Sequence, residues 1–303
     1  MMILLPAKPF LLLFNMAKIM NCIDCYKFSG SGNDFIIIDN RENRMDKSTL
    51  PQFAANICQR KISVGADGLI LIEKSDVADF KWDFYNSDGS IAEMCGNGAR
   101  CAARYAFLNN IADRDMSFET LAGIVSAHVK GDLVRIKMTN PTDFHPRHTI
   151  DLKEGSLTIS SINTGVPHVV VMTDDIKHAP VINTGRQIRF HDHYAPAGTN
   201  VNFICLQKDN TLSIRTYERG VEDETLACGT GAVAGAIISA YHMGLTSPVK
   251  VKTKSNEYLT IFFKNTKGIF SNIYLEGDAR IIYKGELFED AWTERNNKNY
   301  DPC

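Results

Sequence analysis

Short apolar runs rich in β-branched residues recur along the chain, and two longer stretches of small residues interrupt them. The small-residue stretches, 99–108 and 232–243, predict helices, and Gly244 is a typical helix end. Residues 50–60 carry apolar side chains at helical spacing. The pattern predicts a β-rich α+β protein with two prominent helices. The predicted strands are residues 26–28, 35–39, 69–72, 80–85, 124–129, 133–138, 157–162, 168–172, 201–206, 211–217, 249–253, 259–263, 273–275 and 279–283.

Each predicted small-residue helix follows the same motif, which indicates an internal repeat. Cys95-Gly-Asn-Gly-Ala precedes the first helix and Cys228-Gly-Thr-Gly-Ala precedes the second. A tyrosine, Tyr85 or Tyr217, stands about ten residues before each motif. Two such motifs in matching contexts predict two similar halves that face each other across a cleft.

Composition narrows the class of protein. The 303 residues are 44% hydrophobic and 22% charged, which suits one large domain or two ordinary ones. A net charge of −2 argues against a dedicated nucleic-acid or membrane-surface protein. The cysteines are too sparse for a disulfide scaffold, so we expect reduced thiols and a cytoplasmic protein. They are Cys22, Cys25, Cys58, Cys95, Cys101, Cys205, Cys228 and Cys303.

The N-terminal segment is apolar without matching a membrane span. Its longest charge-free stretch, residues 9–17, is shorter than the roughly 20 residues that cross a bilayer. Lys8 lies inside the segment, and no convincing signal cleavage site follows. We expect residues 1–21 to be a dispensable extension, with a divergent targeting peptide as the alternative.

Cys22 and Cys25 form a C-x-x-C pair. A structural zinc site needs two more ligands, and the sequence has no second pair at suitable spacing. A redox pair would open a helix after a strand, whereas this pair leads into strand-like residues. We therefore predict no metal site, and a zinc or thiol-redox module here remains an alternative.

The two Cys-Gly-x-Gly motifs suit acid–base chemistry at a carbon atom. A cysteine at a helix start lies beside free N–H groups and the positive end of the helix dipole. Such positions lower a thiol pKa from about 8.5 to about 3.5–7.5. Two converging helix starts would hold a carboxylate, and two thiols on opposite faces of one carbon could invert it. Racemisation or epimerisation of this kind requires no metal or cofactor.

Neighbouring polar residues fit this chemistry. Arg219 can pair with a substrate carboxylate, and Glu218 can change a thiol pKa as a nearby charge. His168 could donate a hydrogen bond to a thiolate, although a lone histidine is more often structural. Asparagines in turn contexts either shape turns or bind a zwitterion. These are Asn33, Asn86, Asn97 and Asn200.

Together with several further motifs, these residues resemble the diaminopimelate epimerase family, whose members are PLP-independent enzymes of lysine and peptidoglycan precursor synthesis. The resemblance runs from about residue 26 to about residue 283. It implies two pseudo-symmetric lobes, each a mostly antiparallel sheet wrapped around a central helix, with the active site in the cleft. The motifs are Gly30-Ser-Gly-Asn-Asp-Phe35, Gly65-Ala-Asp-Gly68, Tyr85-Asn-Ser-Asp-Gly-Ser90, Cys95-Gly-Asn-Gly-Ala-Arg-Cys101, Tyr217-Glu-Arg-Gly220 and Ala227-Cys-Gly-Thr-Gly-Ala232.

The resemblance implies interconversion of LL- and meso-2,6-diaminopimelate, with a small-molecule amino acid as the only partner besides a possible second copy of the chain. It assigns proton donation to Cys95 and proton removal to Cys228, with the labels exchanged in the reverse direction. Its pKa-modulating positions are His168 and Glu218. Its substrate-binding positions are Asn33, Asn86, Gly96, Asn97, Asn200, Glu218, Arg219, Gly229 and Thr230.

The resemblance also suggests domain limits. An N-terminal lobe would span residues 22–139 and receive a returning strand near 275–288. A C-terminal lobe would span 140–274, and residues 289–303 would form a tail.

Two positions depart from the family pattern. Gly68 stands where many members have a substrate-contacting Gln, and Val166 where many have Asn. The nearest alternative keeps the fold and chemistry but changes the substrate, as in a proline or hydroxyproline racemase-like enzyme. Arg219 and the asparagines instead favour a substrate with a second charged amino-acid end. A nucleotide-binding oxidoreductase is a further alternative, but neither motif matches G-x-G-x-x-G after a strand.

Overall fold

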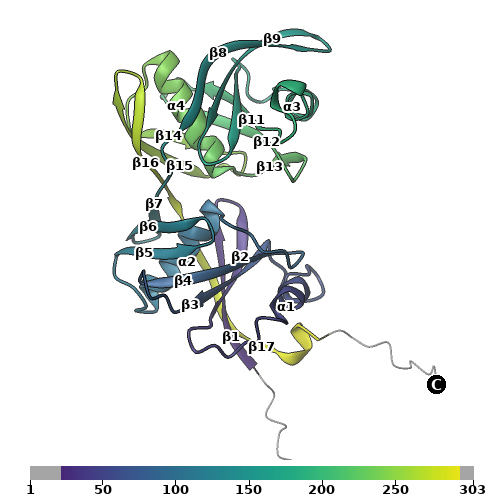
Figure 1. The fold of residues 1–303 in the computed structure, drawn as a ribbon, viewed down its shortest axis with the longest axis vertical. Helices are drawn as coiled ribbons and strands as arrows, with labels where there is room; N and C mark the ends of the chain where they lie inside the picture. Colours follow the sequence, from purple (N-terminus) through teal and green to yellow (C-terminus); the bar gives the residue numbers. More distant parts are fainter. Residues whose placement is uncertain (1–21, 294–303) are drawn as a thin grey trace, which may run out of the picture.

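The computed structural model describes residues 22–293, which form two lobes joined end to end (Figure 1). Residues 1–21 and 294–303 lie outside the described part, and with them the predicted extension and most of the predicted tail. The N-terminal lobe contains β1–β7, α1, α2 and the returning strand β17. Its elements are β1 (Cys22–Gly30), β2 (Asn33–Asp39), α1 (Leu50–Ile57), β3 (Gly68–Glu73), β4 (Phe80–Asn86), α2 (Gly96–Leu108), β5 (Asp115–Thr120), β6 (Gly123–Lys130), β7 (Leu133–Lys137) and β17 (Arg280–Phe288).

The C-terminal lobe contains β8–β16, α3 and α4, and β16 pairs with β7 where the lobes meet. Because of this pairing, the strands of both lobes form one continuous sheet. The elements are β8 (Thr142–Leu152), β9 (Gly155–Asn163), β10 (Pro167–Met172), α3 (Val181–Arg189), β11 (Asn200–Leu206), β12 (Leu212–Glu218), β13 (Asp223–Thr225), α4 (Gly229–Met243), β14 (Val249–Lys252), β15 (Tyr258–Thr266) and β16 (Ile269–Asp278).

Strand pairing repeats from one lobe to the other. In the first lobe β1–β2 and β3–β4 are antiparallel, whereas β2–β3 and β4–β5 are parallel. In the second lobe β9–β10 and β11–β12 are antiparallel, whereas β10–β11 and β12–β14 are parallel. Each lobe then ends in two antiparallel pairings. The predicted α+β fold with pseudo-symmetric, mostly antiparallel lobes is confirmed.

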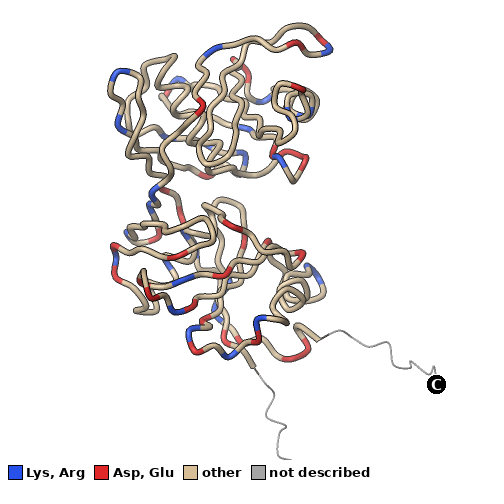
Figure 2. The backbone as a smooth tube through the Cα atoms, in the orientation of Figure 1, with Lys and Arg blue, Asp and Glu red and all other residues tan. Residues whose placement is uncertain are grey.

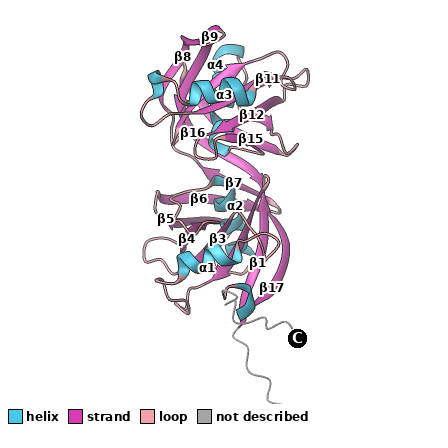
Figure 3. Ribbon diagram, turned by 90° about the vertical axis from the view of Figure 1, so that its right-hand side faces the viewer, coloured by secondary structure: helices cyan, strands magenta, loops and turns pink. Residues whose placement is uncertain are grey.

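A small-residue helix lies inside each lobe, as Figures 1 and 3 show. Every residue of α4 from Gly231 to Ala240 is buried, and most of α2 is buried as well. A helix that is apolar on all sides must be covered on all sides, and small side chains let the strands approach it closely. Because strands enclose each helix, its first turn has a fixed place in the lobe.

Both enclosed helices start three residues earlier than the sequence pattern predicts. They begin at Gly96 and Gly229, and the preceding cysteine is in each case the extended N-cap residue. The prediction began at the first alanine because glycine carries no helical signal. Gly244 ends α4 with a left-handed φ of 72°, as predicted.

The sequence pattern missed α3, β5, β8 and β13. α3 buries only Val181, Gly185 and Ile188, so its apolar face is short. β8 is largely exposed, and only Ile150 on it is buried. An exposed edge strand needs no alternating apolar side chains, so its sequence carries no period-two signal that would predict a strand.

Charges of both signs are interspersed over the two lobes (Figure 2). This distribution agrees with the near-neutral net charge of −2. No helix within residues 22–293 combines the length and apolar character needed to cross a membrane.

Gly185 of α3 packs against Tyr217 on β12, and the end of this strand lines the pocket described below. A Cβ atom on Gly185 would lie 2.6 Å from the Cβ atom of Tyr217. We predict that Gly185→Ala lowers the free energy of unfolding by about 1–3 kcal/mol, because the added methyl group would overlap Tyr217 and force α3 away from β12. Asn183→Ala, on the exposed face of the same helix, is the control and should change it by less than about 0.5 kcal/mol. Equal unfolding midpoints for the two variants in urea would refute this account of α3.

Candidate active site

A pocket of about 830 Å³ lies between the lobes and is lined by residues from both. The lining includes both cysteines of the repeated motif and the first residues of both enclosed helices. It also includes the ends of β4 and β12 and the start of β2. The predicted site residues that line it are Asn33, Asn86, Cys95, Gly96, Asn97, Asn200, Glu218, Arg219, Cys228, Gly229 and Thr230.

The two pocket cysteines occupy equivalent positions. Each is an N-cap residue in extended conformation, with φ −142° at Cys95 and −122° at Cys228. The Cys95 sulfur accepts a hydrogen bond from the backbone N–H of Gly98 at 3.5 Å. The Cys228 sulfur lies 3.5 Å from the hydroxyl oxygen of Thr230. Two thiols with equivalent backbone surroundings therefore face one pocket.

The pKa values of both thiols contradict the expectation from helix ends alone. Burial raises the pKa of Cys95, although the backbone N–H groups of Gly98 and Asn97 act in the opposite direction. Burial, followed by the charge of Glu218, raises the pKa of Cys228 to about 12. Desolvation therefore outweighs the helix N-terminus at both sulfurs, and neutral pH favours the thiol form of each.

Glu218 and Arg219 lie at the end of β12, beside the pocket. The Thr225 hydroxyl donates to the Glu218 carboxylate at 2.7 Å, and burial raises the Glu218 pKa. The backbone N–H of Arg219 donates to the Asn200 side-chain oxygen at 2.9 Å. The Arg219 guanidinium donates to the Ala197 carbonyl at 3.2 Å, which leaves other N–H groups for a ligand.

His168 is not among the residues that line the pocket, and its predicted effect on a thiol pKa stays a prediction. Its side chain is 1% exposed, and its Nδ1 accepts a hydrogen bond from the Asn202 amide at 3.0 Å. Its Nε2 has no hydrogen-bond partner among residues 22–293. Burial lowers the His168 pKa to about 3, so the ring is neutral. A histidine next to a turn gives no sequence signal of the direction in which its ring points.

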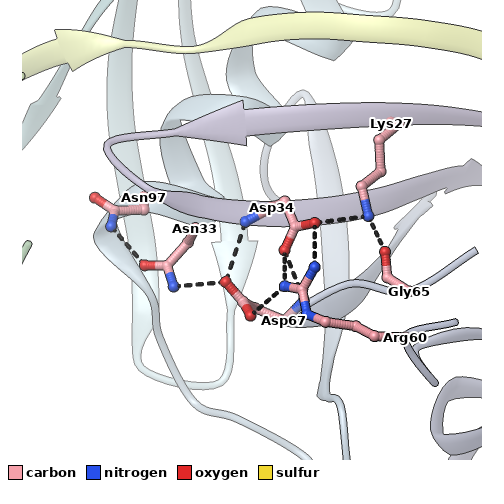
Figure 4. A network of polar contacts seen from close by, with 7 residues as sticks. All are labelled: Lys27, Asn33, Asp34, Arg60, Gly65, Asp67 and Asn97. Carbon is pink, nitrogen blue, oxygen red and sulfur yellow. Dashed lines mark hydrogen bonds and ion pairs between the residues drawn. The ribbon is translucent and has the colours of Figure 1, made fainter. Parts of the chain in front are cut away.

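The asparagines combine structural contacts with exposure to the pocket. Asn86 donates to the Ser90 hydroxyl at 3.0 Å, and Asn200 donates to the Pro167 carbonyl at 3.1 Å. Asn33 instead belongs to a network that extends to Asp67 and Arg60 at the surface (Figure 4). Turn geometry and access to a ligand thus coexist at these positions.

Asp67 and Thr164 also line the pocket, although no sequence pattern assigned a role to either. Asp67 belongs to the Gly-Ala-Asp-Gly motif, so the sequence marked its position but did not indicate what its carboxylate does. The Thr164 hydroxyl donates to the Thr230 carbonyl at 2.9 Å, across a sequence separation of 66 residues. A lone threonine carries no local signal for such a contact.

The two departures from the family pattern have different surroundings. A Cβ atom on Gly68 would lie 2.5 Å from the Phe84 ring and 2.6 Å from the Tyr85 carbonyl, so no side chain fits there. Phe84 lines the pocket instead. Val166 also lines the pocket and adds an apolar side chain.

Cys22 and Cys25 lie on β1, where three positions of separation place side chains on opposite faces. Cys22 is exposed and Cys25 is buried. Within residues 22–293, no group of three or more His, Cys, Asp or Glu side chains is arranged to hold a metal ion.

A family model described as diaminopimelate epimerase matches residues 25–143 and 160–282. The chain belongs to the diaminopimelate epimerase family. It is therefore an isomerase. A diaminopimelate epimerase of Aquifex aeolicus is 44% identical over 282 residues, which cover 89% of this chain and 99% of that protein. A diaminopimelate epimerase of a Hydrogenobaculum species is 46% identical over 275 residues, which cover 86% of this chain and 97% of that protein.

Solved structures of more distant proteins share the fold. A PhzF-family phenazine biosynthesis protein of Bacillus anthracis has a TM-score of 0.69 at 16% identity, over 89% of this chain and 100% of that one. A hydroxyproline epimerase of Agrobacterium vitis, with bound trans-4-hydroxy-L-proline, has a TM-score of 0.63 at 15% identity, over 89% and 93% of the two chains. These likenesses support the two-lobed α+β architecture.

The Glu218 charge acts directly on the Cys228 thiol, and this predicts a measurable effect. Glu218→Gln should lower the Cys228 pKa, because a neutral amide no longer opposes the thiolate. At pH 8.5, alkylation of Cys228 by iodoacetamide should then become faster by a factor on the order of ten.

The rate would be measured by mass spectrometry of the peptide that contains Cys228. Glu93→Gln is the matched control, because Glu93 also lines the pocket but is not among the main causes of the raised Cys228 pKa. An unchanged or slower rate in Glu218→Gln would show that Glu218 does not oppose the thiolate.

Proposed function

We propose that the protein interconverts LL- and meso-2,6-diaminopimelate without a cofactor, using Cys95 and Cys228 as the two acid–base groups. The observation that carries this proposal is the pair of N-cap cysteines that line one pocket from equivalent helices. Membership of the diaminopimelate epimerase family supports the substrate. The small-molecule substrate is a dicarboxylic diamino acid, and the product would serve lysine and peptidoglycan precursor synthesis.

In the LL-to-meso direction, the Cys228 thiolate removes the α-proton and becomes a thiol. The electron pair stays on the α-carbon as a carbanion next to the carboxylate. The Cys95 thiol then donates its proton to the opposite face and becomes a thiolate. Every proton is accounted for, and the reverse reaction uses the two sulfurs with exchanged roles.

The pocket contributes by stabilising negative charge. The backbone N–H groups of Gly96-Asn97 and Gly229-Thr230, at the starts of α2 and α4, stabilise a carboxylate that gains charge as the carbanion forms. Arg219 is available to a second carboxylate. Burial makes the thiolate scarce but also more basic, which suits removal of a weakly acidic proton.

Further parts of the proposal concern the setting of the enzyme. We propose lobes at residues 22–139 with the returning strand and at 140–274, with a tail after residue 288. We also propose a homodimer in the cytoplasm. A reducing compartment is required, because both sulfurs must stay free to carry protons.

The proposed reaction is tested by incubation with LL-diaminopimelate in D₂O without added cofactor. We expect meso-diaminopimelate with one α-deuterium, detected by chiral chromatography and mass spectrometry. L-Proline and trans-4-hydroxy-L-proline are parallel substrates. Inversion of either of these, with diaminopimelate unchanged, would overturn the proposal in favour of a proline racemase-like enzyme.

The two-thiol assignment predicts the effect of single substitutions. Cys95→Ser and Cys228→Ser should each lower kcat/KM by about 100- to 10,000-fold, because a serine hydroxyl is a much weaker acid and base near neutral pH. Cys205→Ser is the control: this buried cysteine lies on β11 and donates to the Asp174 carbonyl. Near-wild-type turnover by either pocket variant, measured beside this control, would exclude that cysteine as an acid–base group.

A further inference from the structure

Arg100 is a buried cation in α2, about one turn after Cys95, the N-cap residue of that helix. Its side chain is 0% exposed. Its Nη2 donates to the Ser31 hydroxyl at 2.7 Å and to the Asn97 side-chain oxygen at 2.9 Å. Its other contacts are the backbone carbonyls of Asp278 at 3.3 Å and Gly96 at 3.4 Å. All of these acceptors are uncharged, which is unusual for a buried guanidinium.

The contact with Asn97 begins a chain of hydrogen bonds along one wall of the pocket. The Asn97 amide nitrogen donates to the Asn33 side-chain oxygen at 2.7 Å. The Asn33 amide nitrogen donates in turn to the Asp67 carboxylate at 2.8 Å (Figure 4). Asn33, Asp67 and Asn97 all line the pocket.

The two ends of this chain fix its direction. A guanidinium can only donate hydrogen bonds, and an ionised carboxylate can only accept them. If the amide of Asn97 or Asn33 were flipped, two donors or two acceptors would face each other. Arg100 and Asp67 therefore determine the orientation of both amides, although neither contacts the other.

Each amide nitrogen in the chain carries a second N–H group. Among residues 22–293, the contacts of the Asn33 and Asn97 nitrogens occupy one N–H each. The remaining N–H groups are free for an anionic oxygen in the pocket. A flipped amide would present its oxygen to that anion, which would exchange a hydrogen bond for repulsion.

We propose that Arg100 and Asp67 are positioning residues that hold the amides of Asn97 and Asn33 in the orientation that binds a substrate carboxylate. This inference rests on the proposed function, because it takes the pocket to be the substrate site. Both residues act through the asparagines and do not touch the substrate.

The surroundings of both ends keep them in place. Arg60 binds Asp67 at 2.9 Å and also binds Asp34, which Lys27 binds at 2.9 Å (Figure 4). At the other end, a Cβ atom on Gly277 would lie 3.0 Å from the Arg100 Nε, so β16 lies directly against the guanidinium. The Arg100 charge also acts on Cys95, where it lowers the thiol pKa against the effect of burial.

The test compares Arg100→Met, Arg100→Lys, Asp67→Asn and the double variant Arg100→Met/Asp67→Asn with the wild type. Arg104→Gln is the matched control, because Arg104 lies one turn further along α2 and also donates to a backbone carbonyl, that of Ala279. The readouts are KM and kcat for LL-diaminopimelate. Side-chain amide signals of Asn33 and Asn97 in ¹⁵N-labelled protein provide a readout that needs no substrate.

We expect Arg100→Met and Asp67→Asn each to raise KM about tenfold, because the lost interaction binds ground state and transition state alike. Asp67→Asn should leave kcat nearly unchanged, whereas Arg100→Met should also change kcat, because the Arg100 charge acts on the Cys95 thiol. The double variant should be no worse than the more affected single variant, because one break frees both amides. Arg100→Lys keeps a donor and a charge, so its KM should lie nearer the wild-type value. Arg104→Gln should leave both constants unchanged.

The spectra of the substrate-free protein test whether each substitution affects the asparagine that the substituted residue does not contact. Arg100→Met should move the Asn33 signals, and Asp67→Asn should move the Asn97 signals, although neither pair is in contact. If the wild type does not epimerise diaminopimelate, the proposed function fails, and the spectra still decide whether the chain fixes the amides.

An unchanged KM in Asp67→Asn would overturn the inference even if Arg100→Met did not fold. So would multiplying effects in the double variant, about a hundredfold in KM, because independent sites would then be responsible. Shifts confined to the directly contacted asparagine would overturn it as well.

Discussion

The site depends on the enclosure of α2 and α4 by the strands of their own lobes. Because each helix is covered on all sides, its first turn cannot move without disturbing a sheet. The pairing of β7 with β16 joins the two sheets, so both first turns open on one pocket. Cys95 and Cys228 occupy equivalent N-cap positions as a consequence of this repeat. The symmetric chemistry that inverts a carbon atom thus follows from a symmetric fold.

Two electrostatic effects oppose each other in the pocket. Burial raises the pKa of both thiols, and the charge of Glu218 adds to this effect at Cys228. The backbone N–H groups of Gly98 and Asn97 and the buried charge of Arg100 act in the other direction at Cys95. A thiolate formed under these conditions is rare and strongly basic. Exclusion of water is therefore part of the acid–base chemistry.

Local patterns in the sequence predicted the two enclosed helices, most strands and the repeat, because apolar periodicity and the Cys-Gly-x-Gly motif are local signals. They missed α3, β8 and β13, where few side chains are buried, and they also missed β5. The site depends more on long-range contacts. The bonds from Arg100 through Asn97 and Asn33 to Asp67 join three segments of the chain, and no spacing within one segment reveals them. The position of His168 and the direction of the thiol pKa shifts also depend on burial, which needs the assembled fold.

The central claim is that two thiols act on opposite faces of one carbon, and early isotope partition in D₂O tests it most directly. LL-diaminopimelate would be recovered from the reaction at early times, together with the meso product, and both would be analysed for α-deuterium. The account predicts deuterium in the product and none in the recovered substrate, because different sulfurs remove and deliver the proton. Equal deuterium in both from the first turnovers would contradict it, because a single base would then serve both faces.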